Sequence, residues 1–398
     1  MKGLIKYLAP FAPDQSGATG VLYGLGGLLV VCDAGGCTGN ICGFDEPRWF
    51  LRQNSLAVSD SSTEEISATA RGSAYIENTG NSTDASPGII LSAGLRDMDA
   101  ILGRDEQLIA KLQLAVKQLG SPFAALIGTP GPAVIGTDYA ALRRMAEKRC
   151  GLPVLGLPCT GTGLYDEGEE IAYLSLFKRF LESRTEKASP SFASAHKASV
   201  AQPEIVPGRL GILGATPLNL STATPSERLR KALGTNDLLC YGASGGLAAI
   251  ALAPTVEKNL VVAPSGLAAA KYLQKRFGTP YEVACPLLPE DFAEKAASLA
   301  GKRVLILHQQ VLANEARKVL ATLGCTDVTV ATFFRLEKEL SNAGDLHLTE
   351  EGDLADLLAN GGFEAVIGDR YLSRCCRTFA GEWIHLPHFA VSGECADI

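Results

Sequence analysis

Long hydrophobic runs and an excess of positive charge are both absent from this sequence of 398 residues. The longest apolar stretches, 23–31 and 247–253, are much shorter than the roughly 18 residues that span a bilayer, so no membrane partner is expected. Residues 1–13 lack the apolar core and small-residue cleavage site of a secretory signal, which predicts a cytoplasmic protein. The net charge of −7 argues against a nucleic-acid partner, because such binding needs a concentrated basic face.

Histidine is scarce and a P-loop lysine is absent. Five histidines are few for a hydrolytic metalloenzyme. Glycine-rich turns occur at 23–28 and 128–136, but no lysine of a phosphate-binding P-loop follows either of them. The sequence therefore argues against ATP hydrolysis by this chain and disfavours dinucleotide binding.

What the sequence does contain is a repeated pattern of strands and helices. Short apolar runs are each followed by a turn and a segment of helical periodicity. They lie at 123–129, 153–159, 209–216, 259–263, 302–308 and 364–368. Near-continuous apolar strands that alternate with helices are typical of α/β folds with parallel sheets covered on both faces. Three similar runs begin about 90 residues apart, which favours three Rossmann-like domains over one large sheet.

Composition suggests where these domains begin and end. A stretch rich in Ser, Ala, Pro and Lys has no apolar periodicity and is expected to be a linker. The expected order is an N-terminal Rossmann-like domain over 1–184, the linker over 185–208, a second Rossmann-like domain over 209–300 and a third over 301–398. A polar stretch at 55–87 is expected on the surface, with a short helix at 63–71.

Cysteine is unusually abundant. Eleven cysteines in a chain expected to be cytosolic do not predict disulfides, and most of them fit buried thiols. Cys32, Cys37 and Cys42 differ, because they occupy one glycine-rich loop after an apolar strand. Thiolates on such loops are typical ligands of iron–sulfur clusters, whose sulfurs also accept hydrogen bonds from backbone N–H groups.

The loop offers three thiols, whereas a 4Fe–4S cluster takes four ligands. Asp14, Asp33 and a cysteine from a second subunit are the candidates for the fourth. The alternative is a tight glycine turn with incidental buried thiols. Zinc is a weaker alternative, because the loop lacks the two close CxxC pairs of structural zinc sites.

Other residues are candidates for contacts with a substrate. Arg48, in the segment DEPRW after the cysteine loop, is either an anion contact or a partner in a surface ion pair. His388, in HLPHF, follows a predicted strand end, where α/β sheets bind ligands, or is a satisfied structural histidine. Cys375 and Cys376 lie between two arginines, which would lower a thiol pKa on exposure. Adjacent helical side chains point apart, so these two thiols are not expected to share a site.

Together these features resemble the nitrogenase component 1 family, which includes nitrogenase catalytic subunits, their cofactor scaffolds and dark-operative protochlorophyllide reductase. The resemblance covers most of the chain and depends on the order and spacing of several segments. They are 10–17 followed by 32–42, the acidic-hydrophobic-glycine segment at 95–119, GTPGPAVIGTDY at 128–139 with 151–158, NLVVAPSGLAAAKYLQKRFGTP at 259–280, and 301–324. It implies three Rossmann-like domains and an N-terminal loop that holds cluster ligands.

The resemblance also implies which residues would bind the cluster. Cys37 occupies the position of the family's central cluster cysteine. The family's ligand position before Cys37 falls in 10–17, where no cysteine occurs and Asp14 is a polar residue. The ligand position after Cys37 falls near Pro130, where cysteine is also absent. Cys32 and Cys42 flank Cys37, so a rearranged ligand set is implied.

The substrate site departs from the family as well. The cysteine that anchors the nitrogenase cofactor is implied near 262–263, where none occurs, and His388 is the match to the cofactor histidine. Arg96, in the segment 95–119, joins Arg48 and His388 as an implied substrate-binding residue. Dinitrogen reduction is therefore not expected.

The implied function is that of a component 1-like subunit in a two-component iron–sulfur reductase of an anaerobe. A separate ATP-dependent P-loop iron–sulfur protein would donate electrons, and the substrate would be an unidentified small molecule or tetrapyrrole. A homodimer or a heterodimer with a related component 1-like subunit is implied. The main alternative is a non-catalytic cofactor-binding or scaffold protein that keeps the fold and has lost the cluster. A binding protein of the periplasmic type is disfavoured, because no signal peptide is evident.

Overall fold

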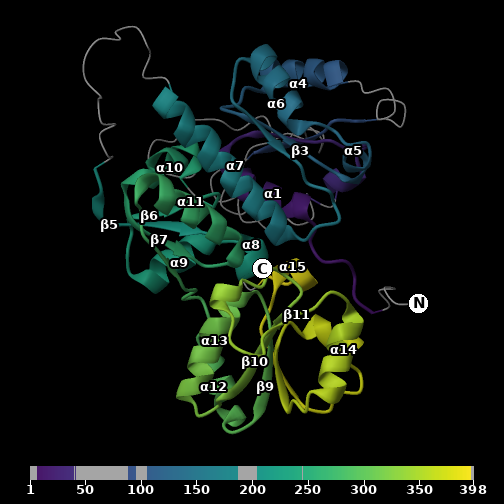
Figure 1. The fold of residues 1–398 in the computed structure, drawn as a ribbon, viewed down its shortest axis with the longest axis vertical. Coiled ribbons are helices and arrows are strands. Elements are labelled where there is room, and N and C mark those ends of the chain that lie inside the picture. Colours follow the sequence, from purple (N-terminus) through teal and green to yellow (C-terminus); the bar gives the residue numbers. More distant parts are fainter. Residues whose placement is uncertain are drawn as a thin grey trace, which may run out of the picture.

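The computed structural model describes residues 7–39, 41, 88–95, 105–186, 204–243 and 245–395. They form three parallel sheets flanked by helices, so the chain is an α/β protein with three Rossmann-like units, as predicted (Figure 1). The helix expected at 63–71 lies outside the described residues.

The first sheet has the strand order β2-β1-β3-β4. Its elements are β1 (Leu28–Val31), β2 (Ile89–Ser92), β3 (Ala124–Ile127), β4 (Val154–Leu157), α1 (Asp14–Leu22), α4 (Asp105–Leu119), α5 (Pro130–Val134), α6 (Tyr139–Cys150) and α7 (Tyr165–Glu186). Leu28 and Val30 pack with α4 and α6 on one face, whereas Leu29 packs with α1 and α7 on the other. Burial on both faces explains why these strands are unbroken apolar runs.

The second sheet has the order β6-β5-β7-β8, and the third has the order β11-β10-β9-β12-β13. The strands are β5 (Val206–Leu213), β6 (Leu238–Cys240), β7 (Val256–Val261), β8 (Tyr281–Val283), β9 (Arg303–Leu307), β10 (Asp327–Thr332), β11 (Leu346–His347), β12 (Ala365–Gly368) and β13 (Glu382–His385). The helices are α8 (Pro217–Leu220), α9 (Pro225–Leu233), α10 (Gly246–Leu252), α11 (Leu267–Phe277), α12 (Phe292–Ala296), α13 (Gln310–Thr322), α14 (Glu351–Asn360) and α15 (Phe389–Ser392), with 3-10 turns η3 (Pro264–Gly266) and η6 (Arg370–Cys375). The strand β5 begins inside the stretch expected to be a linker.

Helices α1 and α7 cross with their backbones in contact. A Cβ atom added to Gly17 would lie 1.7 Å from the Tyr165 carbonyl oxygen, and one added to Gly168 would lie 1.7 Å from the Asp14 carbonyl oxygen. Each helix therefore needs glycine where it meets the other. This close crossing fixes the start of α7, which carries several of the polar residues described below.

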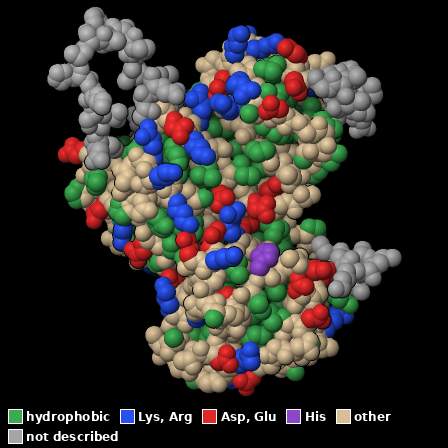
Figure 2. Space-filling model, in the orientation of Figure 1, with side chains coloured by type: hydrophobic (Ala, Val, Ile, Leu, Met, Phe, Trp, Pro, Cys, Tyr) green, Lys and Arg blue, Asp and Glu red, His purple; other side chains and the backbone are tan. Residues whose placement is uncertain are grey.

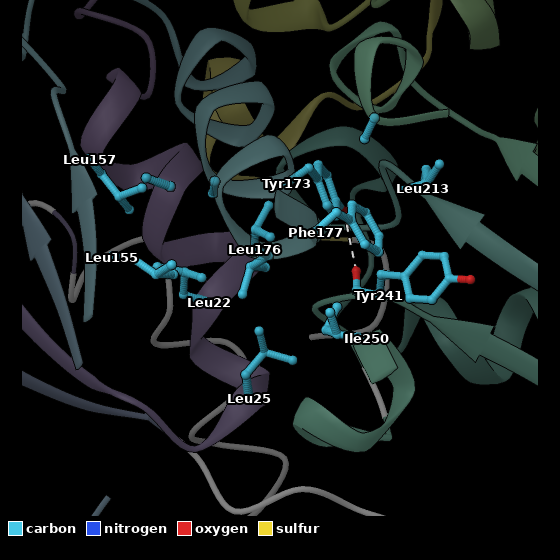
Figure 3. Close-up of a cluster of buried hydrophobic side chains, with 14 of the residues drawn as sticks. Leu22, Leu25, Leu155, Leu157, Tyr173, Leu176, Phe177, Leu213, Tyr241 and Ile250 are labelled. Carbon is cyan, nitrogen blue, oxygen red and sulfur yellow. Dashed lines mark hydrogen bonds between the residues drawn. The ribbon is translucent and has the colours of Figure 1, made fainter. Parts of the chain in front are cut away.

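The first and second units share one hydrophobic core, which α7 joins (Figure 3). Phe177 and Tyr241 pack edge to face with ring centroids 5.1 Å apart. The hydroxyl of Tyr173 donates to the Tyr241 carbonyl at 3.2 Å and accepts from the Gly214 N–H at 3.1 Å. The hydrogen bonds and the apolar contacts together hold the second sheet against α7.

No helix in the described part of the chain has the length and apolar character to cross a membrane. On the face shown in Figure 2, lysine and arginine side chains are mixed with aspartate and glutamate. Such mixing is typical of an ordinary solvated surface.

Candidate functional site

The cysteine loop begins where β1 ends, at the carboxyl edge of the first sheet. Residues 36–39 continue as a helix. The Asp33 carboxylate holds this turn, because it accepts hydrogen bonds from the Thr38 N–H at 2.8 Å, the Thr38 hydroxyl at 3.0 Å and the Ser92 hydroxyl at 2.8 Å. Both Asp33 oxygens are thus engaged in organising the loop.

Asp14 anchors a second loop at the same edge. It is the first residue of α1, and its carboxylate accepts from the Gly161 N–H at 2.8 Å, the Thr160 N–H at 2.7 Å and the Thr160 hydroxyl at 3.1 Å. The side chain is buried. As placed, Asp14 fixes the loop between β4 and α7 to the start of α1, with no oxygen left unengaged.

Two of the nearby cysteines are buried thiols. Cys32 is 1% exposed, and burial raises the pKa of its thiol to about 12. Cys159 is equally buried, and burial followed by the Asp14 charge raises its pKa well above the usual value. Both are protonated at neutral pH, whereas iron needs thiolates as ligands.

Cys37 is the more accessible of the two described thiols of the loop, and glycines lie on both sides of it in the sequence. Burial, Asp33 and Asp14 raise its pKa, in that order of importance. Cβ atoms added to Gly36 or Gly39 would meet no described atom within 4 Å, and neither residue has a positive φ. Among the described residues, nothing therefore covers the backbone on either side of the thiol.

The remaining predicted residues, Cys42, Arg48 and Arg96, lie outside the described residues. Within the part that the structure describes, no group of three or more His, Cys, Asp or Glu side chains is arranged to hold a metal ion. The described donors of one chain therefore do not fit a complete iron–sulfur cluster, since Cys32 is buried and Asp14 and Asp33 accept hydrogen bonds within the chain, which leaves Cys37 among them.

A second polar cluster lies where the carboxyl ends of the second and third sheets meet α7. Its centre is Glu169, which is fully buried. The carboxylate accepts from the Thr216 hydroxyl, the Asn219 amide at 2.6 Å and the Ser265 hydroxyl at 2.5 Å. Burial is the chief cause that raises its pKa to about 7. Glu169 therefore joins the first unit to two loops of the second.

His388 lies in the same junction and is 1% exposed. Its Nε2 is 3.0 Å from the Tyr165 hydroxyl, and the ring also makes a backbone hydrogen bond with Leu218. The imidazole stacks on His308 at 4.2 Å and contacts Phe334 edge to face at 4.8 Å. As placed, His388 has no free ring nitrogen for a substrate or a metal.

Both histidines of this stack are neutral. Burial lowers the pKa of His308 to about 4, and burial followed by the neighbouring His308 lowers that of His388 well below its usual value. The Nδ1 of His308 accepts from the Gln309 N–H at 2.9 Å, so its Nε2 donates to the Pro387 carbonyl at 3.1 Å. The stack therefore packs the third unit against the second without a buried charge.

Sequence reasoning missed most of this polar centre, although a signal was present. Asp369, whose carboxylate accepts from the His388 N–H at 2.8 Å, belongs to the same centre. Thr216, Ser265, His308 and Asp369 each follow closely after an apolar strand. Parallel strands place such residues at one edge of their sheet. The arrangement raises the pKa of Glu169 and ties three units together.

Comparisons with known proteins agree with this architecture. Residues 65–294, more than half of the chain, match the family described as nitrogenase component 1 type oxidoreductase. No curated protein matches. A solved nitrogenase Cp1 structure at pH 6.5 is similar with a TM-score of 0.61 and 11% identity, over 97% of this chain and 87% of that one. A nitrogenase Cp1 structure at pH 5 is similar with a TM-score of 0.60 and 13% identity, over 98% of this chain and 85% of that one. At such identities the likeness shows the fold alone.

Proposed function

Because the chain belongs to the nitrogenase component 1 type oxidoreductase family, we propose that it is the component 1-like subunit of a two-component iron–sulfur reductase. A separate ATP-dependent P-loop iron–sulfur protein donates the electrons. The substrate is a small molecule or tetrapyrrole other than dinitrogen. The exclusion of dinitrogen is supported by Val262 and Ala263, which are apolar where the family resemblance implies a cofactor cysteine.

The observation that supports this proposal is the turn around Cys37, whose backbone no described residue covers. Glycine inside a helix costs roughly 0.5–1 kcal/mol relative to alanine. Gly36 and Gly39 are helical, and neither a positive φ nor a described neighbour requires glycine there. A group from outside the described chain that approaches the Cys37 backbone closely explains both glycines.

We assign that group as an iron–sulfur cluster shared between subunits. Cys37 supplies one thiolate, and the other ligands come from Cys42 and from a second subunit, because Cys32 is buried and Asp14 and Asp33 are engaged. When bound, a cluster relays single electrons. The chain's own contribution is to fix the loop through Asp33. The Thr38 N–H donates to Asp33 and the Gly39 N–H to the Gly35 carbonyl, so the N–H groups of Gly36 and Cys37, at the start of the helix, are the ones that would donate toward sulfur.

Alanine at Gly36 or Gly39 is expected to separate folding from cluster binding. Each substitution should leave the free energy of unfolding unchanged or raise it by up to about 1 kcal/mol, because the added methyl lies in a helix and meets no described atom within 4 Å. Each should also lower the iron and sulfide bound after anaerobic reconstitution. Gly352→Ala in α14, where a Cβ also meets open space, is the matched control and should change stability alone. Equal iron binding in all three variants would contradict the proposal.

Cys37→Ser is expected to remove the visible absorbance and the acid-labile sulfide of the reconstituted protein, because serine does not replace a thiolate toward iron. The control is Cys150→Ser, which changes a cysteine at the end of α6 and should keep both signals. Size-exclusion chromatography of the same samples shows whether iron binding accompanies dimer formation.

The second candidate function is a non-catalytic cofactor-binding or scaffold protein of the same fold. The incomplete donor set among the described residues favours it. Wild-type protein that forms its native oligomer and retains no iron or sulfide after reconstitution would establish this second candidate in place of the first.

A further inference from the structure

Two adjacent cysteines in the third unit bring their sulfur atoms together. Cys375 ends η6, just beyond the carboxyl end of β12, and Cys376 follows it. Their Sγ atoms are 3.5 Å apart, and the Cys375 thiol donates a hydrogen bond to the Leu372 carbonyl at 3.1 Å. The expectation that adjacent thiols point apart was wrong, because the helical turn ends here and Cys376 has φ −119° and ψ 46°.

The two thiols are not equivalent. Cys376 is 6% exposed, whereas Cys375 is partly exposed. The hydrogen bond between them is the main cause that lowers the pKa of Cys375 and raises the pKa of Cys376, whose burial adds to the rise. Cys375 is therefore the sulfur that ionises more readily and is easier to reach, and its thiolate can accept a hydrogen bond from the Cys376 thiol 3.5 Å away.

We propose that Cys375 and Cys376 form a thiol–disulfide exchange site for small-molecule disulfides. The Cys375 thiolate attacks one sulfur of the disulfide and releases the other as a thiol, which leaves a mixed disulfide on Cys375. Cys376 then loses its proton and attacks the Cys375 sulfur, which releases the second thiol and closes a bond between the two cysteines. The protein loses two electrons and two protons, and the small disulfide gains them.

The geometry makes this bond easy to reverse. Adjacent Cα atoms are about 3.8 Å apart across a trans peptide, below the range of about 4.4–6.8 Å in ordinary disulfides. A bond closed under that constraint is strained, and strained disulfides are readily reduced. The pair therefore suits a reversible exchange reaction better than a structural cross-link.

The exchange site also adjoins the N-terminal segment. In the same turn, the Tyr371 hydroxyl accepts a hydrogen bond from the Ala9 N–H at 2.8 Å, and the Arg374 guanidinium lies over the Tyr371 ring at 5.0 Å. The Arg377 guanidinium lies 5.0 Å from the Tyr7 ring centroid. Closing the bond must adjust the backbone at the end of η6 and in the residues that follow it, from which these contacts extend.

Oxidised glutathione is a suitable probe for the reduced full-length protein. After acid quenching and alkylation, a protease that cuts after glutamate releases 365–382, in which Cys375 and Cys376 are the only cysteines. We expect this peptide to carry no alkyl group after treatment with the probe. Its mass should be two hydrogen atoms below that of the reduced, unalkylated peptide. Added reduced glutathione should restore both thiols. The proposal is overturned if both thiols remain alkylated at the highest probe ratio, or if either is joined to Cys395.

Single variants separate the two roles. Cys376→Ser should trap one glutathionyl group on Cys375, because no adjacent thiol completes the exchange. Cys375→Ser should leave Cys376 unmodified, since its thiol is buried. Cys150→Ser is the control and should behave as the wild type does. A glutathionyl group that accumulates on Cys376 instead of Cys375 would reverse the assigned roles and overturn the mechanism.

Discussion

Alanine in place of Gly168 is expected to lower the free energy of unfolding by about 3 kcal/mol, at the upper end of the usual cost of overpacking. The added Cβ would lie 1.7 Å from the Asp14 carbonyl oxygen, and that atom belongs to the backbone of α1. A backbone atom cannot rotate away as a side chain can. The two helices must therefore separate, and the core that α7 shares with the second unit must shift with them.

Gly17→Ala tests the same crossing from the other helix, because its Cβ would lie 1.7 Å from the Tyr165 carbonyl oxygen. Each single variant should unfold at lower denaturant concentration than the wild type. The double variant should lose less than the sum of the single losses, because one separation of the helices relieves both clashes. Gly352→Ala should show no loss. Additive effects would mean that the two glycines pack independently.

The strands could be predicted because burial on both faces leaves a plain sequence pattern. The run at 302–308 contains β9, and the run at 123–129 contains β3. The crossing of α1 and α7 left no such pattern. Gly17 and Gly168 are ordinary glycines in sequence, and their importance comes from a contact between segments that are far apart along the chain.

The candidate site was predictable only in part, for a similar reason. The position of Cys37 just after a strand follows from its own segment. The engagement of Asp14 depends on N–H groups of Thr160 and Gly161, which only the fold brings near it. Glu169 is one of several acids at the start of α7, and no periodicity separates it from the exposed Glu167.

The pH dependence of stability is expected to change when Glu169 is replaced by glutamine. The folded pKa of about 7 is above the unfolded value of 4.5. Between these values the unfolded chain has lost the proton and the folded chain keeps it. The contribution of Glu169 to the free energy of unfolding is therefore full below pH 4.5 and is lost as the pH rises to about 7, by about 3 kcal/mol in total.

The two stacked histidines act in the opposite direction. Their folded pKa values are below 6.5, so stability decreases as the pH falls below 6.5 and the unfolded histidines gain protons. The wild-type curve alone therefore mixes opposing slopes. The difference between wild type and Glu169→Gln isolates the carboxyl group, since both proteins retain the histidines.

Glutamine imitates the protonated carboxyl at every pH. Its oxygen can accept from Asn219 and Ser265, and its amide can donate to the Thr216 hydroxyl, so the shape and most hydrogen bonds of the centre are kept. Relative to this variant, the wild type should lose about 3 kcal/mol between about pH 4.5 and 7 in denaturant titrations. Glu182→Gln removes an exposed charge from the same helix. Its free energy of unfolding should depend on pH in the same way as that of the wild type. If the stability of Glu169→Gln showed the same pH dependence as the wild type, the three hydrogen-bond donors would be sufficient to offset the cost of burial. Glu169 would then be ionised in the folded protein.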